Sequence, residues 1–494
     1  MNGENELYEL HEGWVWTTLG EIAEYINGKA FKKSEWETRG RPIIRIQNLT
    51  NTKNVINRYS KPIEEKYIIK DGDFLISWSA TLGTYIYKGE EAVLNQHIFK
   101  VKSFMNKMFL FYLFSAYIES LKQKIHGTGM QHITKTKFEN TSIPLPPLQE
   151  QKRIVSKIEE LFTNVDAGVS SLVQTKNQLK KYRQSLLKYA FKGKLTEEWR
   201  KIHKDELEPA STLLEKIKKE QNKEGKRKKR KYKDNFVDDS DLYELPEGWI
   251  WTRIEEIYQS MRNGIYKPKK YYSDNGIACL RMYNINNGRI IWENIKRMKI
   301  SEKEIEEYKL EPGDILINRV NSRELVGKAA IIPKNMEICV FESKNIRLKL
   351  NPKIHNEYVA YWFQIHSQKY FNKNAQQTVG MASINQNQIS LLPIPLPPLK
   401  EQQQIVEILD QQFSIIDELE KTTEINLKKA ERLRQSILKK AFKGKLVPQD
   451  PSDEPAHLLL ERIKAQKERE KNDKRKSKKN TFDSNQTRLI DYDK

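Results

Sequence analysis

Cysteine is scarce in this chain, and long apolar runs are absent from it. Its 494 residues include only Cys279 and Cys339, too few for a disulfide framework or a four-cysteine zinc site. We interpret both as buried thiols of an intracellular protein. The longest apolar run, 108–118, is too short to span a bilayer. The start, MNGENELYEL, is acidic and has no apolar segment, so no secretory signal is expected and we predict a cytoplasmic protein.

Catalytic signatures are also missing. The sequence has no Walker A pattern, no Gly-rich dinucleotide fingerprint, no HExxH and no GxSxG. GTGMQH at 127–132 resembles a phosphate-binding loop but lacks the Lys-Ser/Thr ending. The Gly-Asp turns lack the additional recurring carboxylates that a metal nuclease needs, and the eight histidines show no ligand spacing. The sequence therefore favours a protein that binds rather than catalyses, without a metal site or cofactor of its own.

Positive charge is abundant, with a net charge of +21. Much of it lies in two runs, 216–233 and 462–479, while the blocks 12–142 and 247–392 are also net basic. Such runs are either solvated flexible tails or phosphate-binding segments. Basic blocks favour a nucleic-acid partner, because Lys and Arg neutralise phosphates.

The chain contains an internal repeat, in which the same series of motifs occurs twice in the same order. The pairs are EGWVWTTLGEI (12–22) with EGWIWTRIEEI (247–257), DGDFLISW (71–78) with PGDILINR (312–319), IPLPPLQEQ (143–151) with IPLPPLKEQ (394–402), RQSLLKYAFKGKL (183–195) with RQSILKKAFKGKL (434–446), and PASTLLEKI (209–217) with PAHLLLERI (455–463). The offset grows within the globular blocks and then stays constant from IPLPP to AFKGKL. A segment of fixed length suits a spacer or packed rod, whereas diverged blocks suit two different tasks.

The residue patterns predict an α+β domain of about 140 residues in each copy. Strand-like runs such as PIIRIQNL, GDFLISW, CLRMYNI and GDILINR are followed by helix-like stretches at 107–124 and 356–372. The paired prolines of IPLPPL are expected to end a strand and open a helix. AFKGKL places a glycine after a Lys-bearing last turn, as a helix C-terminus does.

Heptad rows follow each IPLPPL. They are Ile158, Val165, Leu172, Leu179 and Leu186, with Leu161, Gly168, Thr175 and Tyr182 three residues on, and then Leu409, Ile416, Thr423, Ala430 and Ile437, with Leu419 and Leu433. Such rows are typical of a coiled coil. Because the seams are weak, we expect the two helices to pair antiparallel with each other, with polar positions setting the register. The alternative is two unrelated amphipathic helices, each docked on its own domain.

The doubled EGWxWT, GD[FI]LI, IPLPPLxEQ and RQSxLKxAFKGKL, in this order over nearly the whole chain, resemble the specificity subunit of type I restriction–modification systems. The resemblance implies two target recognition domains, at 1–143 and 244–394, and two conserved spacer helices, at 144–195 and 395–446. It leaves 196–243 as a basic linker and 447–494 as a basic, flexible tail.

The resemblance also implies a non-catalytic subunit that reads a bipartite double-stranded DNA site, one domain per half-site. Two methyltransferase subunits and two motor–nuclease subunits would assemble on it and bring S-adenosylmethionine, ATP and magnesium. Two alternatives stay open at this point: a DNA-modifying enzyme with its own active site, and a coiled-coil scaffold that never touches DNA. The lack of an Asn-Pro-Pro-Tyr-like motif disfavours the first alternative.

Candidate DNA-binding residues lie after the strand-like runs and around the Gly-Met loops, because Arg, Lys, Asn and Gln contact phosphates or base edges. In the first block they are Lys29, Arg45, Trp78, Thr81, Gln96, His97, Gln131, His132 and Lys135. In the second block they are Arg262, Lys267, Arg281, Asn284, Arg319, Asn321, Arg323, Lys344, Asn345, Ser383 and Asn385. Arg45 and Arg281 recur in both copies, which favours a role in the fold or at a phosphate over sequence readout.

Overall fold

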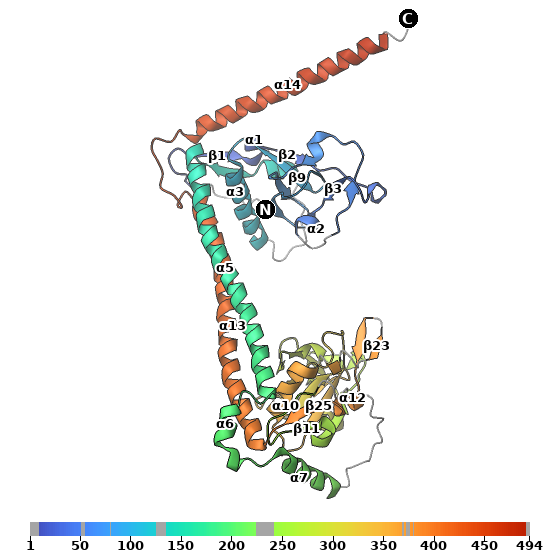
Figure 1. The fold of residues 1–494 in the computed structure, drawn as a ribbon. Coiled ribbons are helices and arrows are strands. Elements are labelled where there is room, and N and C mark those ends of the chain that lie inside the picture. The colour runs from blue at the N-terminus through green and yellow to red at the C-terminus, as the bar shows by residue number, and fades with distance from the viewer. Residues whose placement is uncertain are drawn as a thin grey trace. The chain divides into compact units, whose positions relative to one another are not determined.

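The computed structural model describes residues 9–50, 55–79, 81–124, 135–223, 242–367, 370–371, 376–378 and 380–490. These divide into two compact units. Unit 1 is Met1–Val173 with Glu424–Lys494, and unit 2 is Gln174–Thr423. Each unit therefore joins one globular block to parts of both long helices, shown as α5 and α13 in Figure 1.

Two small four-stranded sheets form the globular domain of unit 1, the first of the two recognition domains that the sequence predicts. Their strand orders are β2 (Ala23–Asn27), β9 (Ile98–Ser103), β6 (Phe74–Ser77), β7 (Gly83–Ile86), and β4 (Arg58–Tyr59), β3 (Arg41–Ile44), β8 (Ala92–Leu94), β5 (Ile68–Ile69). The first sheet is antiparallel, and β3 and β8 form a parallel pair in the second. Helix α3 (Lys107–Lys124) contributes Phe109, Leu110 and Phe114 to the core beside the first sheet.

The recognition domain of unit 2 repeats this plan. Its sheets run β12 (Tyr258–Asn263), β22 (Asn345–Leu350), β18 (Ile315–Asn318), β20 (Ala329–Ile331), and β13 (Tyr272–Ser273), β17 (Lys296–Met298), β14 (Ile277–Leu280), β21 (Cys339–Phe341). Here β14 and β21 are the parallel pair. This unit also contains β15 (Ile285–Asn286), β16 (Arg289–Ile290), α9 (Glu302–Tyr308), β19 (Val320–Asn321), β23 (Gln376–Thr378) and β24 (Met381–Ser383). The α+β prediction with two similar domains is confirmed.

Two predicted strands are shorter than expected. PIIRIQNL ends as a strand at Ile44 and continues as α2 (Ile46–Leu49), because the Asn48 side chain accepts a hydrogen bond from the Arg45 backbone N–H. CLRMYNI likewise leaves β14 at Leu280 and turns into a 3₁₀ helix, Met282–Asn284. The predicted helix at 107–124 is present, and that at 356–372 begins as α10 (Asn356–Trp362) and continues as a π-helix, Phe363–Ser367.

The doubled motifs EGWxWT and IPLPPLxEQ meet in the structure. Strand β1 (Val15–Thr18) pairs antiparallel with β10 (Ser142–Leu145), and β11 (Ile250–Arg253) pairs in the same way with β25 (Pro393–Leu396). The indole N–H of Trp14 donates to the buried carboxylate of Glu150 over 2.9 Å, and that of Trp249 donates to Glu401 over 2.8 Å. Each Trp–Glu bond ties the domain's first strand to the start of a long helix.

The glutamine that follows each buried glutamate completes this junction. Gln151 donates from Nε2 to the carbonyl of Pro146 and accepts the Asn106 backbone N–H. Gln402 makes the same pair of bonds, to the Pro397 carbonyl and from the His355 backbone N–H. The amide thereby satisfies a proline carbonyl just after the strand, and it links the long helix to the segment that opens the domain's own helix.

Both long helices are longer than forty residues, α5 from Leu148 to Phe191 and α13 from Leu399 to Ala441. In unit 1 the beginning of α5 shares a core with the end of α13, whereas in unit 2 the end of α5 shares a core with the beginning of α13. Both cores require antiparallel helices, and this prediction is confirmed. Figure 1 shows the two helices side by side.

The companion row of α13 differs from the prediction. Leu419 and Leu433, expected in the seam, are 47% and 51% exposed. The inward row instead lies four residues after the main row, and its members are Phe413, Glu420, Leu427, Arg434 and Ala441. Heptad spacing alternates three and four, so one apolar row is compatible with a companion on either side. The sequence favoured the row three residues after the main row because that row contains Leu419 and Leu433, which the structure leaves exposed.

An arginine from each RQS repeat binds across the helix pair. In unit 2 the Arg183 guanidinium pairs with Asp417 and lies 4.4 Å from the centre of the Phe413 ring. In unit 1 Arg434 pairs with Asp166 and lies 5.0 Å from the centre of the Phe162 ring. These two arginine clamps hold the register of the pair, a role that the sequence analysis gave to polar positions without naming either arginine.

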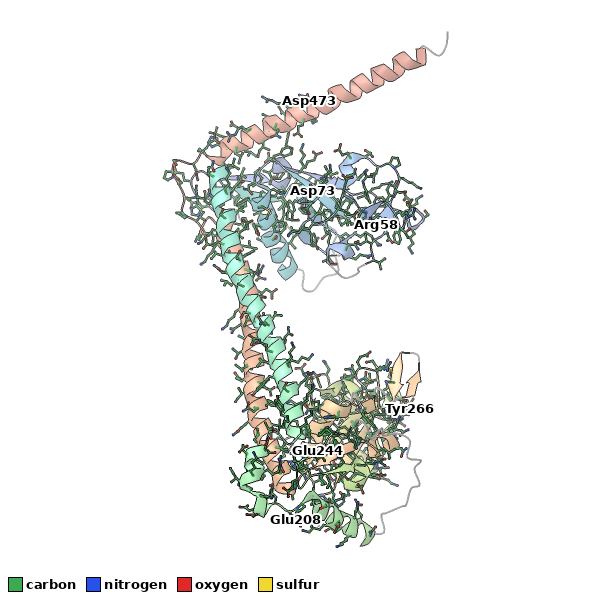
Figure 2. The ribbon with its side chains drawn as sticks, in the orientation of Figure 1. Arg58, Asp73, Glu208, Glu244, Tyr266 and Asp473 are labelled. Carbon is green, nitrogen blue, oxygen red and sulfur yellow. The ribbon has the colours of Figure 1, made fainter. Side chains whose placement is uncertain are left out.

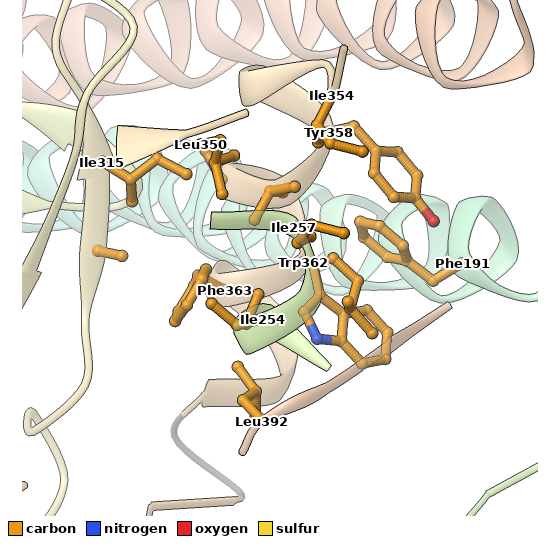
Figure 3. Packing of buried hydrophobic residues seen from close by; sticks show 14 of the residues in the cluster. Phe191, Ile254, Ile257, Ile315, Leu350, Ile354, Tyr358, Trp362, Phe363 and Leu392 are labelled. Atoms are coloured by element: carbon orange, nitrogen blue, oxygen red, sulfur yellow. The ribbon is translucent and has the colours of Figure 1, made fainter. Parts of the chain in front are cut away.

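The AFKGKL repeats end the helices as predicted. Gly193 and Gly444 adopt φ of 66° and 67°, a left-handed conformation that favours glycine. Phe191, just before the first of these caps, inserts between Tyr358 and Trp362 in the core of unit 2, with ring centres 5.1 and 5.0 Å away (Figure 3). The end of α5 is therefore part of the domain core.

Packed helices lie in both the expected basic linker and the expected basic tail. The linker forms α6 (Glu197–Ile202) and α7 (Ala210–Lys223), and the tail forms α14 (Ala456–Ile490). The Ala210 N–H donates to the Gly248 carbonyl, and the Ala456 N–H donates to the Gly13 carbonyl. In unit 2 the apolar residues of PASTLLEKI are buried, and in unit 1 Ala456, Leu459 and Ile463 of PAHLLLERI are buried. In the sequence, the basic runs at 216–233 and 462–479 are more prominent than these short apolar segments, which lie directly before or at the start of the runs. Residues 224–233 of the first run lie outside the described residues.

We predict that the two equivalent glutamates respond differently to substitution. Glu401 accepts hydrogen bonds from Thr196 and Arg200 in addition to Trp249, so Glu401→Gln leaves a partly buried arginine without its counter-charge and should cost about 3 kcal/mol of unfolding free energy. Glu150 has no such arginine, and burial raises the pKa of its carboxyl. Glu150→Gln should therefore be neutral or stabilising at pH 7.

The pH dependence provides a second check. A carboxyl whose pKa is raised by folding favours the folded state at low pH, and this contribution is lost as the pH rises through the folded pKa. Any stabilisation by Glu150→Gln should therefore disappear on acidification toward pH 4. Denaturant unfolding of the parent and both variants at the two pH values measures these differences. Equal losses for the two variants at pH 7 would contradict the asymmetry.

Candidate nucleic-acid interface

The two recognition domains share a set of backbone hydrogen bonds that link one small sheet to the other, which we call the end frame. In unit 1 it comprises Gly28 N to Ile98 O, Lys29 N to Leu94 O, Asn95 N to Ile44 O, Gln96 N to Lys29 O and Trp78 N to His97 O. In unit 2 it comprises Gly264 N to Asn345 O, Ile265 N to Phe341 O, Glu342 N to Leu280 O, Ser343 N to Ile265 O and Arg319 N to Lys344 O. All ten distances lie between 2.8 and 3.2 Å.

A glycine holds the closest approach in each end frame. A Cβ atom on Gly28 would lie 2.2 Å from the Asn95 carbonyl oxygen, and one on Gly264 would lie 2.2 Å from that of Glu342. Only a residue without a side chain allows the two strands to approach so closely. The backbone of the end frame is thus fixed in the same way in both units.

The side chains on the end frame differ between the units. Five positions of the end frame carry different residues in units 1 and 2. They are Lys29 and Ile265, Trp78 and Arg319, Asn95 and Glu342, Gln96 and Ser343, and His97 and Lys344, with the residue of unit 1 given first. Arg45 and Arg281 are the same in both, and each backbone N–H is bound by the asparagine three residues later at 3.0 Å. A shared pattern of backbone hydrogen bonds that presents different side chains is the arrangement expected of two domains that recognise different sequences.

A pocket of about 620 Å³ opens beside the end frame of unit 2. Its lining is rich in cations and aromatic rings: Tyr266, Lys267, Lys269, Tyr272, Arg281, Lys296 and Lys344. Arg281 also binds Glu342, 2.9 Å away. Tyr266 is 79% exposed, and Figure 2 shows it on the outside of the unit. Cations interleaved with exposed rings suit a nucleic-acid backbone and its bases.

Comparison with known proteins agrees with this geometry. The sequence model of the family described as type I restriction modification DNA specificity domain matches residues 11–180 and 246–429. These two segments make up well over half of the chain. The chain belongs to the type I restriction–modification DNA specificity family.

Two relatives from Escherichia coli match along almost their whole length. The EcoBI specificity subunit is 26% identical over 94% of both chains. The EcoKI specificity subunit, from strain K12, is 28% identical over 93% of this chain and 96% of its own. A chain of a solved type I R-M system has the same fold, with a TM-score of 0.61 and 21% identity over 89% of this chain and all of that one.

These relatives are specificity subunits, a non-catalytic class, so this specificity subunit is not itself an enzyme. Family membership excludes the alternative of a self-contained DNA-modifying enzyme. Within the described ranges no cluster of three or more His, Cys, Asp or Glu side chains is arranged to hold a metal ion. In the same ranges, no helix combines the length and apolarity needed to cross a membrane.

The candidates of unit 1 fall into three groups. At the end frame or next to it lie Lys29, Arg45, Trp78, Gln96 and His97. Thr81 is exposed on the turn between β6 and β7, whereas Lys135 in α4 (Lys135–Glu139) donates to the Tyr25 carbonyl and has a structural role. Gln131 and His132 lie outside the described residues.

Electrostatics at Lys29 explain how one of these cations is held. Its ammonium group donates to the Tyr59 hydroxyl over 3.0 Å and lies 3.6 Å from Glu35. The hydrogen bond to Tyr59, assisted by the Glu35 charge, raises the pKa of Lys29 above its ordinary value. The side chain therefore remains a cation at the edge of the frame.

Three candidates of unit 2 have internal hydrogen-bond partners, which favours a structural role for them over contact with DNA. Asn284, Asn321 and Asn345 are buried. The Asn345 amide donates to the Leu280 carbonyl and accepts from Asn318, while Asn321 donates to Asn318. Asn284 binds the Arg281 N–H and the carbonyls of 291 and 293. Buried amides need internal partners, and the sequence does not show which asparagines are buried.

The other candidates of unit 2 differ in exposure and in partners. Arg281, Arg319 and Lys344 lie at the end frame, and Lys267 lines the pocket while paired with Glu304 at 2.6 Å. Arg262 is engaged with Glu307, and Asn385 caps α12 (Gln386–Ser390). Arg323 is exposed, and Ser383 pairs with Val320 in the β19–β24 ladder.

Sequence reasoning missed part of the pocket lining. Tyr266, Lys269 and Lys296 were not among the candidates, although the stretch YKPKKYY at 266–272 alternates rings with lysines. That alternation was the available signal, because stacking platforms and phosphate contacts occur together in nucleic-acid grooves.

We predict that Gly28→Ala disrupts the end frame of unit 1. Because the added methyl group would meet a backbone carbonyl, the substitution should cost about 1–3 kcal/mol of unfolding free energy. Gly168→Ala is the matched control, since nothing lies within 4 Å of a Cβ at this position in α5, and it should stabilise the protein by about 1 kcal/mol. Denaturant unfolding measures both, and a Gly28→Ala variant as stable as the parent would show that the close approach is not required.

Proposed function

We propose that this specificity subunit reads a bipartite DNA site, with one recognition domain on each half-site and with α5 and α13 setting the gap between the halves. The shared end frame with exchanged side chains carries the proposal. A common backbone lets both domains approach the duplex in the same way, and different side chains let them recognise different base edges.

The charges of unit 2 support contact with phosphates as well as bases. Lys267 and Arg281 have carboxylate partners at 2.6 and 2.9 Å, which fix their position at the pocket. Lys269, Lys296 and Lys344 line the same pocket, and for them no ion pair is recorded among the described residues. We infer that Lys269 and Lys296 contact phosphates, and that binding weakens as the salt concentration rises, because binding releases counterions from the DNA.

The two long helices support the spacer role through their length and their locked register. They contain 44 and 43 residues and end in the same glycine cap. One arginine clamp lies in each unit, formed by Arg183 with Asp417 and by Arg434 with Asp166. Because the two helices cannot slide past each other, their length can set a constant distance between the two half-sites.

We further propose that two methyltransferase subunits and two motor–nuclease subunits assemble on this chain in the cytoplasm. S-adenosylmethionine, ATP and magnesium would bind to those subunits. Apolar side chains exposed on α13 support such assembly: Ile415 and Leu419 in unit 2, Ile425 and Leu433 in unit 1. Exposed apolar side chains on an otherwise charged helix fit a protein partner, because water disfavours them.

We expect the gap in the recognised site to change with helix length. Four residues inserted after Gln174 in α5 and four before Glu424 in α13 lengthen both helices by about 6 Å, and base pairs are about 3.4 Å apart. The gap should therefore grow by one or two base pairs, while the bases on either side stay the same. Sequencing of methylated adenines in cells that express the variant with its methyltransferase gives the site.

The matched control replaces four residues at the same two places with heptad-compatible residues and leaves the length unchanged. It should methylate the parental site. A lengthened variant that methylates the parental site at the parental level would show that the helices do not set the gap. A parental protein whose methylated site is a single uninterrupted sequence would refute the bipartite proposal itself.

A further inference from the structure

We propose that one pair of side chains on each end frame determines which base is accepted at one position of its half-site: Trp78 with His97 in unit 1, and Arg319 with Lys344 in unit 2. This inference rests on the proposed function and assigns the specificity within it to named residues. It also predicts that the two half-sites differ at the positions read by these pairs.

The backbone places the members of each pair side by side. Trp78 and Arg319 are the residues directly after β6 and β18. Each donates its backbone N–H to its partner, to His97 over 3.2 Å and to Lys344 over 2.8 Å. This bond lies one step beyond the sheet ladder, so the two side chains leave neighbouring strands at the same end of the sheet.

In unit 1 the pair is aromatic. The indole N–H of Trp78 donates to Asn27 over 3.2 Å, and the ring lies edge-to-face with the His97 imidazole, with centres 5.1 Å apart. Among the described residues the buried Nδ1 of His97 has no hydrogen-bond partner. An aromatic pair without a permanent charge suits an apolar base edge such as the thymine methyl group.

The backbone of His97 is strained. Its φ of 75° lies in the left-handed region, which costs a non-glycine residue of order 1 kcal/mol or more. The equivalent Lys344 does not have a positive φ. Strain of this kind persists where the surrounding structure imposes it, and it occurs often at binding sites. A glycine or asparagine would tolerate this φ at lower cost than the histidine does.

In unit 2 the pair is cationic. The Arg319 guanidinium is oriented by a contact with the Ser343 carbonyl at 3.4 Å, and Lys344 lies at the pocket beside Arg281. Arginine and lysine carry donors only, and guanine presents two acceptors, N7 and O6, in the major groove. We therefore infer that the half-site read by unit 2 contains a guanine at the position facing this pair.

The test begins with the methylated site of the parental complex, which comprises the specificity subunit and its methyltransferase. Affinity is then measured for duplexes substituted at one position at a time. For R319A/K344A, we expect preference for guanine over the other bases to fall roughly tenfold or more at one position of one half-site, and preferences elsewhere to be unchanged. R41A is the control, since Arg41 starts β3 and is paired with Glu91. It should retain every preference.

The reciprocal variant W78R/H97K gives unit 1 the pair of unit 2. It should alter the accepted base in the other half-site only. An equal loss of affinity by R319A/K344A for all duplexes would overturn the inference, because it would show that the pair contacts phosphates rather than a base. Unchanged preferences in both variants would overturn it as well. A parental site that is not bipartite would instead refute the proposed function, so the two failures are distinguishable.

Discussion

A buried hydrogen bond between a tryptophan and a glutamate, present once in each unit, is the constraint on which the rest of the structure depends. Trp14 binds Glu150 and Trp249 binds Glu401, and in each case the tryptophan belongs to the first strand segment and the glutamate to the first turn of a long helix. The bond fixes where each long helix leaves its domain. It also explains why the two motifs are repeated together, since the buried indole N–H of each tryptophan donates to the glutamate of the other motif.

From these junctions the two copies build the same backbone and then diverge in their side chains. Each end frame needs a glycine to bring its strands together, and both copies have one. What differs is the chemistry at the sheet end, aromatic at Trp78 and His97 and cationic at Arg319 and Lys344. Scaffold and reader are thus separate sets of residues. A protein that recognises two different sequences with one architecture requires this separation. The side chains that contact bases can then differ without loss of the backbone hydrogen bonds of the end frame.

The repeats allowed the two domains, the antiparallel helices and the glycine caps to be predicted from the sequence, because each of these depends on local pattern or on length. The buried amides could not be predicted. Asn345 reads like a surface donor, yet its side chain is enclosed by Asn318 and the Leu280 carbonyl. The same holds for the seam of α13, where Leu433 is exposed and Arg434 is turned inward onto Phe162. Burial of this kind depends on tertiary partners far away in the sequence.

Exchange of residues 12–142 for the corresponding block of another specificity subunit tests the central claim most directly. The exchanged protein would be expressed with its methyltransferase and its methylated adenines mapped by sequencing. The account predicts that one half-site changes to that of the donor, while the other half-site and the gap stay the same. A change in both half-sites, or in the gap, would contradict the independence of the two readers.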